Sequence, residues 1–473
     1  METLPTPSRP LYRVGTLTYT RGALFAVMFW MLWGDFFFYL FESVTPALMP
    51  LQLRWEGASD SMIGFLTSPN AIFALCFYPV IGMQSDRHRG RLGRRRPFLL
   101  WCTPPVVLSL VLLGAAKPSG AVLYRVIHAL GFSTGLTLAG CTIAWITVCS
   151  VVFIIFNSYV QQIYLYLFVD VIPKEVMGRF IALYRVLGAA GGFAFNHWIL
   201  GHAKSHTLYI CVLCGLLYAA AFYMIIWRVK EGEYPPPPPR RPGNRLAGAR
   251  RYLAECYTHP FYLTYFSVSF FFWASLVPMG SFLVFFATQA GQPGYAPTLG
   301  LSLTEYGNVK SWTGLMQIPA FFLIGPLIDR FHAIRVSLVG LLLASVTFFL
   351  CYALIRDGRS MMLWLGLNQA ANAIFLGAGA ALMPLLLPRE RYGQFVSANQ
   401  TLGYSSIIVG PPLCGILMGA LRNYRWIFVF SGVCTTVSFL VLVSVYVQWR
   451  RLGGDRHFTP PDTRRDIPDT HPC

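Results

Sequence analysis

Twelve stretches of mostly apolar residues, each close to the length of a membrane-spanning helix, constrain this chain more than any other feature. A helix needs roughly 20 apolar residues to cross the hydrocarbon core of a bilayer. The sequence therefore predicts twelve spans, at 24–48, 62–84, 98–116, 140–169, 180–200, 207–228, 260–287, 306–328, 335–355, 361–387, 394–420 and 425–447. A shorter amphipathic stretch at 121–132 is interpreted as a re-entrant or interfacial segment in the third loop.

The composition agrees with a membrane protein and excludes several other classes. Hydrophobic residues make up 55% of the 473 residues, charged residues only 12%, and the mean hydropathy is +0.53. An ordinary soluble domain carries about 25% charged residues, and so few charges cannot cover the surface of a soluble protein of this size. We therefore expect an all-α integral membrane protein rather than a soluble enzyme, a nucleic-acid-binding protein or a disordered chain.

The positive charge of the chain predicts its orientation in the membrane. The net charge is +18, and 27 of the 37 Lys and Arg residues lie in the two tails and the even-numbered loops, against 8 in the odd-numbered loops. Loops rich in Lys and Arg stay in the cytoplasm. We expect both termini to be cytoplasmic, in a multi-pass protein of the plasma (inner) membrane, with membrane lipid as a partner and no bound nucleic acid.

Two loop motifs occur twice, each time six spans apart. The loop after span 2 contains G-x-x-x-D-R at Gly82 to Arg87, and the loop after span 8 contains it at Gly325 to Arg330. The pattern P-x-E-x-x-G-x-F follows span 4 at Pro173 to Phe180 and span 10 at Pro388 to Phe395. Matching motifs in matching topological positions indicate a parallel duplication of a six-helix unit.

This duplication predicts the domain organisation. Residues 1–228 form an N-terminal six-helix bundle with a polar tail, and residues 260–447 form a second six-helix bundle. Residues 229–259 form a linker that contains Pro235 to Pro239, and five consecutive prolines make a stiff spacer. Docking of a partner on the prolines is the alternative. Residues 448–473 form a polar C-terminal tail.

The twelve spans and the duplicated loops resemble the major facilitator superfamily over nearly the whole chain. Within it, Ser85-Asp86-Arg87, followed after five residues by Gly93-Arg94-Arg95-Arg96-Pro97-Phe98, is similar to the sucrose-type and glycoside–pentoside–hexuronide cation symporters. The commoner superfamily spacing has a glycine where this chain has Arg89. The resemblance implies two pseudo-symmetric six-helix bundles, twelve transmembrane helices in all, and a monomer.

The repeated loops are candidates for a conformational switch. An aspartate at a helix end accepts backbone N–H groups or an arginine of a neighbouring helix, and a contact made in only one conformation biases the equilibrium between two states. Simple retention of basic loops in the cytoplasm is the alternative explanation. The predicted gating residues are Gly82, Asp86, Arg87, Gly93, Arg94, Arg95, Gly325, Asp329 and Arg330.

Ionisable residues within predicted spans are candidates for proton coupling, because a charge at the centre of a bilayer is costly. Asp35 lies near the middle of span 1, and Glu42, seven residues later, lies on the same helical face. A structural ion pair or a water-filled mouth is the alternative for both. Arg185 of span 5 either reaches the membrane edge or pairs with Asp35, Asp170 or a substrate anion.

Polar and aromatic side chains near the middle of the spans are candidates for substrate binding. Amides form paired hydrogen bonds with hydroxyl-rich solutes, and aromatic rings pack on their C–H faces. Hydrogen bonding between helices is the alternative for each amide. The candidates are Asn70, Asn157, Gln161, Tyr164, Trp273, Gln317, Asn368, Asn372, Asn399 and Tyr404.

These observations predict a secondary transporter that moves a small polar solute by alternating access. A sugar or glycoside carried by symport is expected, with H⁺ as coupling ion and Na⁺ as the alternative, and no cofactor, metal site or catalytic residue. An organic anion, a peptide or a drug is the alternative cargo. A receptor, a channel or a lipid-modifying enzyme is a further alternative, although no Walker loop, metal-spaced His/Cys cluster or nucleophile elbow is present.

Overall fold

The computed structural model describes residues 12–68, 81–82, 84–131, 135, 137–234, 252–288, 293–388 and 391–461. Ten helical stretches of this part are long and apolar enough to cross a membrane. One of them, Lys174–Arg228, contains the two predicted spans 180–200 and 207–228. Most of the predicted span 62–84, including Asn70, lies outside the described residues.

The chain forms two compact units whose boundaries differ from a simple division at the linker. Unit 1 contains Met1–Thr45, Cys76–Phe195 and His202–Pro239, and unit 2 contains Pro46–Leu75, Asn196–Gly201 and Arg240–Cys473. Two pieces of the first half of the sequence therefore belong to the unit that holds the second half.

Unit 1 is a helical bundle that begins with a small hairpin of strands. Its elements are β1 (Tyr12–Val14), β2 (Leu17–Tyr19), α1 (Arg21–Glu42), α5 (Arg96–Gly114), α6 (Ala116–Ala129), α7 (Leu138–Val171), α8 (Lys174–Ala194) and α9 (Ala203–Arg228). The strands are antiparallel, and Gly15 has a φ of +56° in the turn between them. The sequence pattern predicts only a polar tail here, and the hairpin is not predicted by it.

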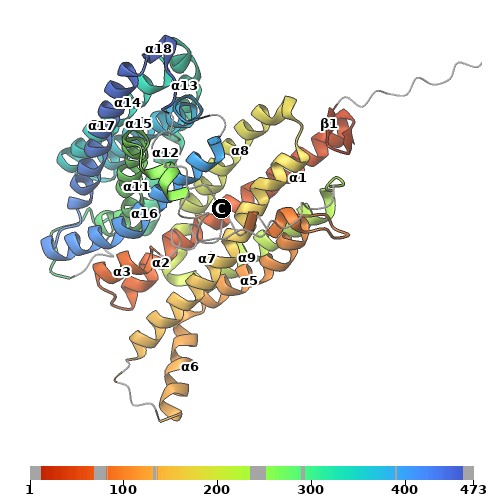
Figure 1. Cartoon of the computed structure of the whole chain (residues 1–473). Coiled ribbons are helices and arrows are strands. Elements are labelled where there is room, and N and C mark those ends of the chain that lie inside the picture. Colours follow the sequence, from red (N-terminus) through yellow and green to blue (C-terminus); the bar gives the residue numbers. More distant parts are fainter. Residues whose placement is uncertain are drawn as a thin grey trace, which may run out of the picture. The chain divides into compact units, whose positions relative to one another are not determined.

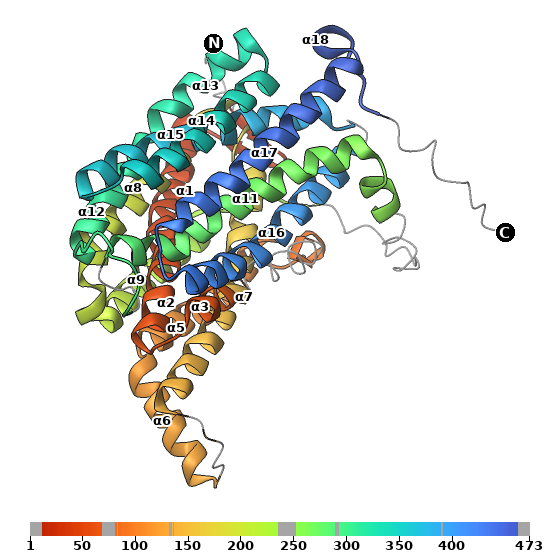
Figure 2. The ribbon, with the colours of Figure 1, turned by 90° about the vertical axis from the view of Figure 1, so that its left-hand side faces the viewer.

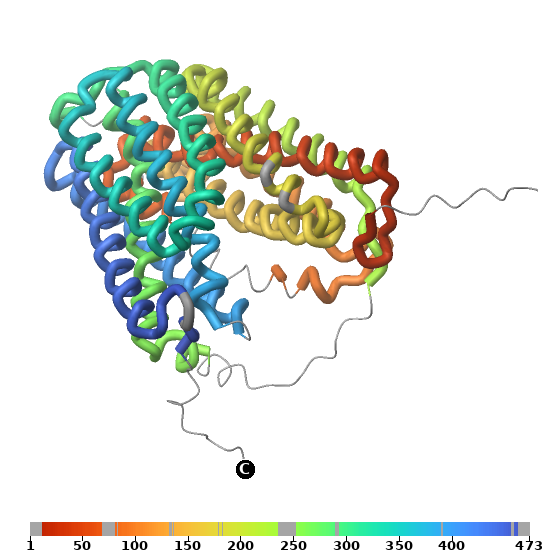
Figure 3. Tube along the Cα trace, turned by 90° about the horizontal axis from the view of Figure 1, so that it is seen from above, coloured from red at the N-terminus to blue at the C-terminus, as the bar shows by residue number. Residues whose placement is uncertain are grey.

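Helix α1 lies in direct contact with α8 and α9 (Figure 3) because glycines remove side chains from the contact surfaces. A Cβ at Gly34 would overlap the side chain of Ile225 on α9, and one at Gly188 would lie 2.8 Å from Tyr39. A Cβ at Gly191 would lie 2.6 Å from the carbonyl oxygen of Phe36. Small residues of this kind let helix backbones approach closely inside a membrane bundle.

Most of the predicted segment 121–132 lies in helix α6, and residue 132 lies outside the described residues. Helix α6 follows α5 after a break at Ala115 and packs against α7 (Figure 1). The 34 residues of α7 exceed the length needed to cross a bilayer, so the first turns of α7 provide a partner for α6. Val122, Val126 and Leu130, spaced four residues apart, are exposed. The amphipathic pattern therefore predicted the position of a helix but not its pairing with α7.

Unit 2 contains the remaining helices. They are α2 (Val44–Trp55), which begins two residues before the boundary, α3 (Asp60–Leu66), α11 (Pro260–Ala287), α12 (Leu303–Met316), α13 (Ile318–Phe331), α14 (Ala333–Leu354), α15 (Gly358–Leu386), α16 (Tyr392–Leu421), α17 (Trp426–Arg451) and α18 (Gly454–His457). A π-helical turn, η1 (Phe195–Ile199), and a 3-10 turn, η2 (Leu200–His202), connect α8 to α9.

The core of unit 2 lies where α11 packs against α16 and α17 (Figure 2). Aromatic side chains fill it, among them Tyr262, Phe266 and Phe395, which are 5% exposed or less. Hydroxyl groups complete the contact between α17 and α11: Ser431 donates to the carbonyl of Ser275, and Ser438 donates to that of Val268. Polar side chains thus satisfy their hydrogen bonds across helices, as the bilayer interior requires.

The glycine contact between α1 and α8 gives a prediction about stability. Replacing Gly191→Ala places a Cβ against the backbone of α1, so we expect a loss of about 1–3 kcal/mol in the free energy of unfolding, as in other overpacked cores. The adjacent Gly192→Ala is the matched control, because its nearest contact would be 3.7 Å from Ser43. A thermal-shift measurement on both purified variants checks this, and equal melting temperatures would contradict it.

Candidate functional site

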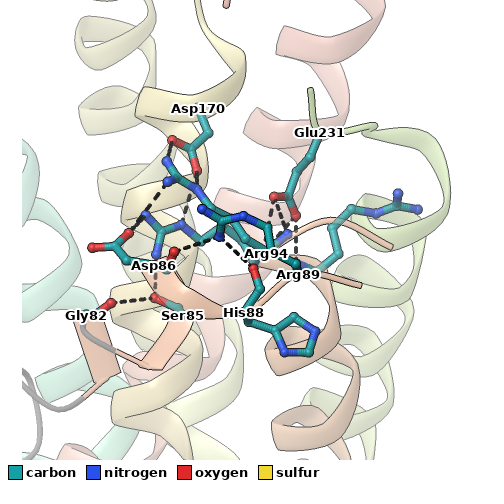
Figure 4. Close-up of polar contacts among 10 residues, drawn as sticks. Gly82, Ser85, Asp86, His88, Arg89, Arg94, Asp170 and Glu231 are labelled. Carbon is teal, nitrogen blue, oxygen red and sulfur yellow. Dashed lines mark hydrogen bonds and ion pairs between the residues drawn. The ribbon is translucent and has the colours of Figure 1, made fainter. Parts of the chain in front are cut away.

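Two arginines that precede α5 hold a network of charges in unit 1 (Figure 4). Arg94 binds Asp170 at the end of α7 through two bonds, Nε–Oδ2 at 3.0 Å and Nη2–Oδ1 at 2.5 Å. Arg95 binds the same carboxylate at 3.1 Å and Asp86 at 2.6 Å. The side chains of Arg95 and Asp170 are only 6% and 7% exposed, whereas that of Asp86 is 58% exposed. Asp170 is thus the buried centre of the network.

Glu231, just after α9, accepts the backbone N–H groups at the start of α5. Its carboxylate oxygens lie 2.9 Å from the N of Arg94, 3.0 and 3.1 Å from that of Arg95, and 2.8 Å from that of Arg96. These donors have no partner within the helix, and an anion at a helix N-terminus is stabilised by the helix dipole. Gly93 makes room for it: its φ is +97°, and a Cβ there would lie 2.7 Å from the Glu231 carboxyl carbon.

The chain that follows Glu231 also contacts Arg94. The ring of Tyr234 lies under Arg94, with the guanidinium carbon 4.0 Å from the ring centroid. Burial and the neighbouring carboxylates of Asp170 and Glu231 raise the pKa of Tyr234 above its ordinary value. The backbone N–H of Glu233 donates to Thr16 Oγ1, in the turn of the N-terminal hairpin, at 2.8 Å. The start of the linker is therefore fixed to α5 on one side and to the hairpin on the other.

The second copy of the loop motif is arranged differently within unit 2. Asp329 and Arg330 are both exposed, and a Cβ at Gly325 would meet nothing within 4 Å. In the part of the chain that the structure describes, no ion pair involves Asp329. A buried carboxylate of unit 2 is instead that of Glu255, which precedes α11 and contacts Arg391 at 3.4 Å and Gln394 at 2.9 Å. The sequence repeat therefore does not produce a repeated network.

The second repeated motif has the same packing in both units. Phe180 and Phe395, the last residues of the two P-x-E-x-x-G-x-F stretches, are fully buried. Phe180 packs edge-on against Phe168, and Phe395 packs edge-on against Tyr262, with ring centroids 5.0 and 4.6 Å apart. Each phenylalanine attaches the beginning of its helix to the core of its own unit.

Asp35 lies in the interior of unit 1 without a hydrogen bond. Its side chain is fully buried, and neither carboxylate oxygen has a partner among the described residues. The hydroxyls of Tyr39 and Tyr184 bond to each other at 3.1 Å, and these tyrosines are electrostatic neighbours of Asp35.

Arg185 is exposed, interacts with Asp35 electrostatically, and forms no described ion pair within 4.0 Å. Asp170, the other predicted partner of Arg185, pairs with Arg94 and Arg95 instead.

Glu42 is the second carboxylate of α1 and has a different environment. Its Oε1 accepts a hydrogen bond from the amide nitrogen of Asn157 on α7. The amide oxygen of Asn157 in turn accepts from the hydroxyl of Tyr218 on α9 at 3.4 Å. A chain of three polar side chains thus connects α1, α7 and α9, and Asn157 is a partner of Glu42 rather than an unoccupied amide.

Several other substrate candidates form hydrogen bonds with other groups of the protein. Asn368 donates to Ala344 and Thr347 of α14 at 3.2 and 3.0 Å, and Asn372 donates to Asn368 at 2.9 Å. Tyr164 donates to the carbonyl of Met31, and Gln317 donates to that of Gly314 at 2.8 Å. The bonds of Asn368 and Tyr164 link two helices, as the alternative interpretation expects, whereas those of Asn372 and Gln317 are made within a helix or at its end.

The remaining candidates differ in how far they are buried. Asn399 is buried, and its amide oxygen has no partner among the described residues. Trp273 is 37% exposed, Gln161 and Tyr404 are partly exposed, and Asn70 lies outside the described residues. Within the described residues, no group of three or more His, Cys, Asp or Glu side chains is placed to hold a metal ion.

Comparison with known proteins identifies the fold. Residues 279–467 match the family model of the Major Facilitator Superfamily. The crystal structure of a point mutant of the nucleoside transporter NupG is similar with a TM-score of 0.67 at 12% identity, covering 89% of this chain and 100% of that one. The chain therefore has the major facilitator fold, and its residues 279–467 match the model of that family.

Other solved structures with this fold are named for different cargoes. A bacterial homologue of the iron transporter ferroportin, in an inward-facing state, has a TM-score of 0.65 at 13% identity, covering 89% of this chain and 99% of that one. The D-xylose-proton symporter has a TM-score of 0.61 at 13% identity, covering 93% and 99%. A search of curated proteins found no match to this chain. At these identities the likeness shows the major facilitator fold and does not identify the cargo.

Two residues of the charge network, Glu231 and Tyr234, are not predicted from the sequence. They lie about 135 residues from the arginines that they contact, and no local pattern connects an acid after α9 to the start of α5. The only signal is composition: a loop with six arginines between 85 and 97 needs carboxylates nearby. The arginines of the predicted gating motif thus have partners from the start of the predicted linker.

The charge network of unit 1 gives a prediction about stability. Asp170→Asn leaves two arginines without their shared buried carboxylate, so we expect a loss of about 3 kcal/mol in the free energy of unfolding. Asp455→Asn is the control, because the pair of Asp455 with Arg335 is exposed on both sides and should contribute less than about 1 kcal/mol. Thermal unfolding of both purified variants measures the difference. A melting temperature of Asp170→Asn equal to that of the control would refute the central role of Asp170.

Proposed function

We propose that this major facilitator protein is a proton-coupled symporter that carries a small polar solute, a sugar or a glycoside, by alternating access. The observation that carries the proposal is the unpartnered carboxylate of Asp35, near the middle of the candidate span Arg21–Trp55. Burying a carboxylate anion without hydrogen bonds is costly, and uptake of a proton removes the charge. A group of this kind binds a proton in one step of a cycle and releases it when water or a cation reaches it.

The surroundings of Asp35 support a role in coupling. Arg185 is the cation whose charge acts on Asp35, and it forms no ion pair with another carboxylate among the described residues. A rearrangement that brings the guanidinium closer to Asp35 favours release of the proton, and one that withdraws it favours uptake. The tyrosines around Asp35 exclude water and donate no hydrogen bond to it in this structure. Coupling therefore depends on a movement of α8 relative to α1.

Glu42 has a different role in the proposal. Because its carboxylate is already hydrogen-bonded to Asn157, a change in its protonation changes the contact between α1 and α7. We assign Glu42 and Asn157 to the solute site, where the second carboxylate oxygen accepts a hydrogen bond from a hydroxyl group. Trp273 and Asn399 of unit 2, a partly exposed ring and a buried amide with an unused acceptor, are the best candidates on that unit.

The orientation and location belong to the same proposal. The excess of Lys and Arg in the tails and even-numbered loops supports a cytoplasmic position for both termini. The network of Asp86, Arg95 and Asp170 then lies at the cytoplasmic end of unit 1, where it stabilises one conformation of the loop. A plasma-membrane location and a monomer complete the proposal.

Replacing Asp35→Asn tests the coupling. The amide cannot exchange a proton, so we expect a pH gradient to drive no accumulation of solute in proteoliposomes, while solute-for-solute exchange continues. Asp455→Asn, an exposed carboxylate far from α1 in sequence, is the matched control and should accumulate solute like the wild type. Gradient-driven uptake by Asp35→Asn at the wild-type rate would refute the proton role of Asp35.

A thermal-shift screen of the purified wild-type protein identifies the cargo class. We expect sugars or glycosides to raise the melting temperature, because ligands that bind only the folded state stabilise it. Organic anions, peptides and hydrophobic amines form the other arms of the screen, since they are the alternative cargoes. A shift confined to one of those arms would replace the sugar proposal with that class.

A further inference from the structure

Arg228, the last residue of α9, lies against two indole rings within unit 1. Its guanidinium carbon is 5.4 Å from the ring centroid of Trp30 on α1 and 4.8 Å from that of Trp227. A guanidinium over an aromatic face is attracted by the ring, and its planar fork of N–H donors remains able to bind an anion. The two rings therefore hold the cation in a defined position.

No carboxylate of the described chain balances this cation. Within the described ranges, no ion pair within 4.0 Å involves Arg228. Glu231, three residues later, accepts the N–H groups at the start of α5 instead. Lys230 is exposed, as Arg228 is. The end of α9 thus presents two positive charges to its surroundings.

Exposed apolar side chains lead from Arg228 into the candidate span Lys174–Arg228. Leu216, Ala220, Met224 and Arg228 follow one another every four residues, so they share one face of α9, and all four are exposed. On α1, which packs against α9, Trp33 is exposed as well. Such a face suits hydrocarbon chains, and the arginine lies where the candidate span ends.

The chemistry of this arrangement matches an anionic phospholipid. Arginine binds two oxygens of a phosphate through parallel N–H donors, and tryptophan is enriched where lipid headgroups meet the hydrocarbon. A choline headgroup would place a further cation beside Lys230, whereas a glycerol headgroup does not. A lipid phosphate also brings acyl chains to the apolar face of α9, which a free phosphate ion leaves uncovered.

We propose that Arg228, Trp30 and Trp227 form a site for the phosphate of one anionic phospholipid, whose acyl chains lie along the apolar face of α9. A lipid that binds here is a discrete ligand of the protein, in addition to the lipids that surround the helices. The proposal requires a chain that spans the membrane, and it does not depend on the solute or the coupling ion.

Titration of the purified full-length protein with phosphatidylglycerol tests the site, because native mass spectrometry gives the dissociation constant of the first bound lipid. Arg228→Gln removes the charge, so we expect this constant to rise about tenfold or more, as for a lost charge-assisted contact. Equal constants for Arg228→Gln and the wild type would overturn the proposal.

Arg451→Gln is the matched control for this titration. Arg451 is also an exposed arginine at the end of a candidate span, Trp426–Arg451. Among the described residues, no cation–π contact involves it. The control should bind phosphatidylglycerol like the wild type, and a loss of affinity equal to that of Arg228→Gln would refute a site built by the two rings.

A photoreactive acyl chain locates the bound lipid. Phosphatidylglycerol with a diazirine in one acyl chain should label α9 between Leu216 and Arg228 in the wild type, and Arg228→Gln should lose most of this label. Labelling that avoids α9 in the wild type, or labelling of α9 that Arg228→Gln retains in full, would contradict the site.

Two further ligands distinguish the sources of the phosphate. Inorganic phosphate should not displace phosphatidylglycerol, because it gains nothing from the apolar face of α9, and phosphatidylcholine should bind about threefold more weakly or less. Displacement by inorganic phosphate would assign the site to a free anion, and equal binding of phosphatidylcholine would remove the preference for an anionic lipid. Either result overturns the proposal.

Trp227→Leu tests the rings without a change of charge. Trp227 is 69% exposed, so the variant should fold, and the loss of one cation–π contact should raise the dissociation constant about threefold. A wild-type constant would show that the ring does not position Arg228 and would refute the site. Lipid binding requires no transport, so a failure of proton-driven uptake leaves these results unaffected.

Discussion

The bilayer interior offers no water to backbone N–H and C=O groups, and this constraint determines the secondary structure and most of the hydrogen bonds of the chain. Helices satisfy these groups internally, which explains why the described spans are helical and why hydroxyl groups such as Ser431 and Ser438 donate to carbonyls across helices. Donors at the helix ends still need partners. Glu231 provides them for α5, and a capping box of Ser302 and Glu305 provides them for α12.

The same constraint explains how charges are distributed. Every buried acidic group described in unit 1 is either paired, as Asp170 is, or hydrogen-bonded, as Glu42 is, with the exception of Asp35. In unit 2 the buried pair of Arg54 and Asp60 is neutral as a whole. An unpaired carboxylate is therefore the exception that calls for a function, whereas the paired ones are explained by stability and by the specification of one arrangement.

Much of the fold was predictable from the sequence because length and apolarity act locally. The all-α membrane fold of the major facilitator type is confirmed. The repeat of P-x-E-x-x-G-x-F indicated two similar helix beginnings, and Phe180 and Phe395 are both buried.

The candidate site was less predictable. The partners of Arg94 and Arg95 come from α7 and from the segment after α9. Such contacts depend on how helices pack, which no local pattern encodes. Similarly, the resemblance between the two G-x-x-x-D-R loops predicted equal roles, but Asp86 is in a network and Asp329 is exposed.

The hydrogen bond between Thr16 and Glu233 has a practical consequence for handling the protein. The first strands are joined to the start of the linker, and the linker is joined through Glu231 to the beginning of α5. An affinity tag or a truncation at the amino end therefore disturbs the segment that orders the arginine loop. Purification tags belong at the carboxyl end, after residue 461.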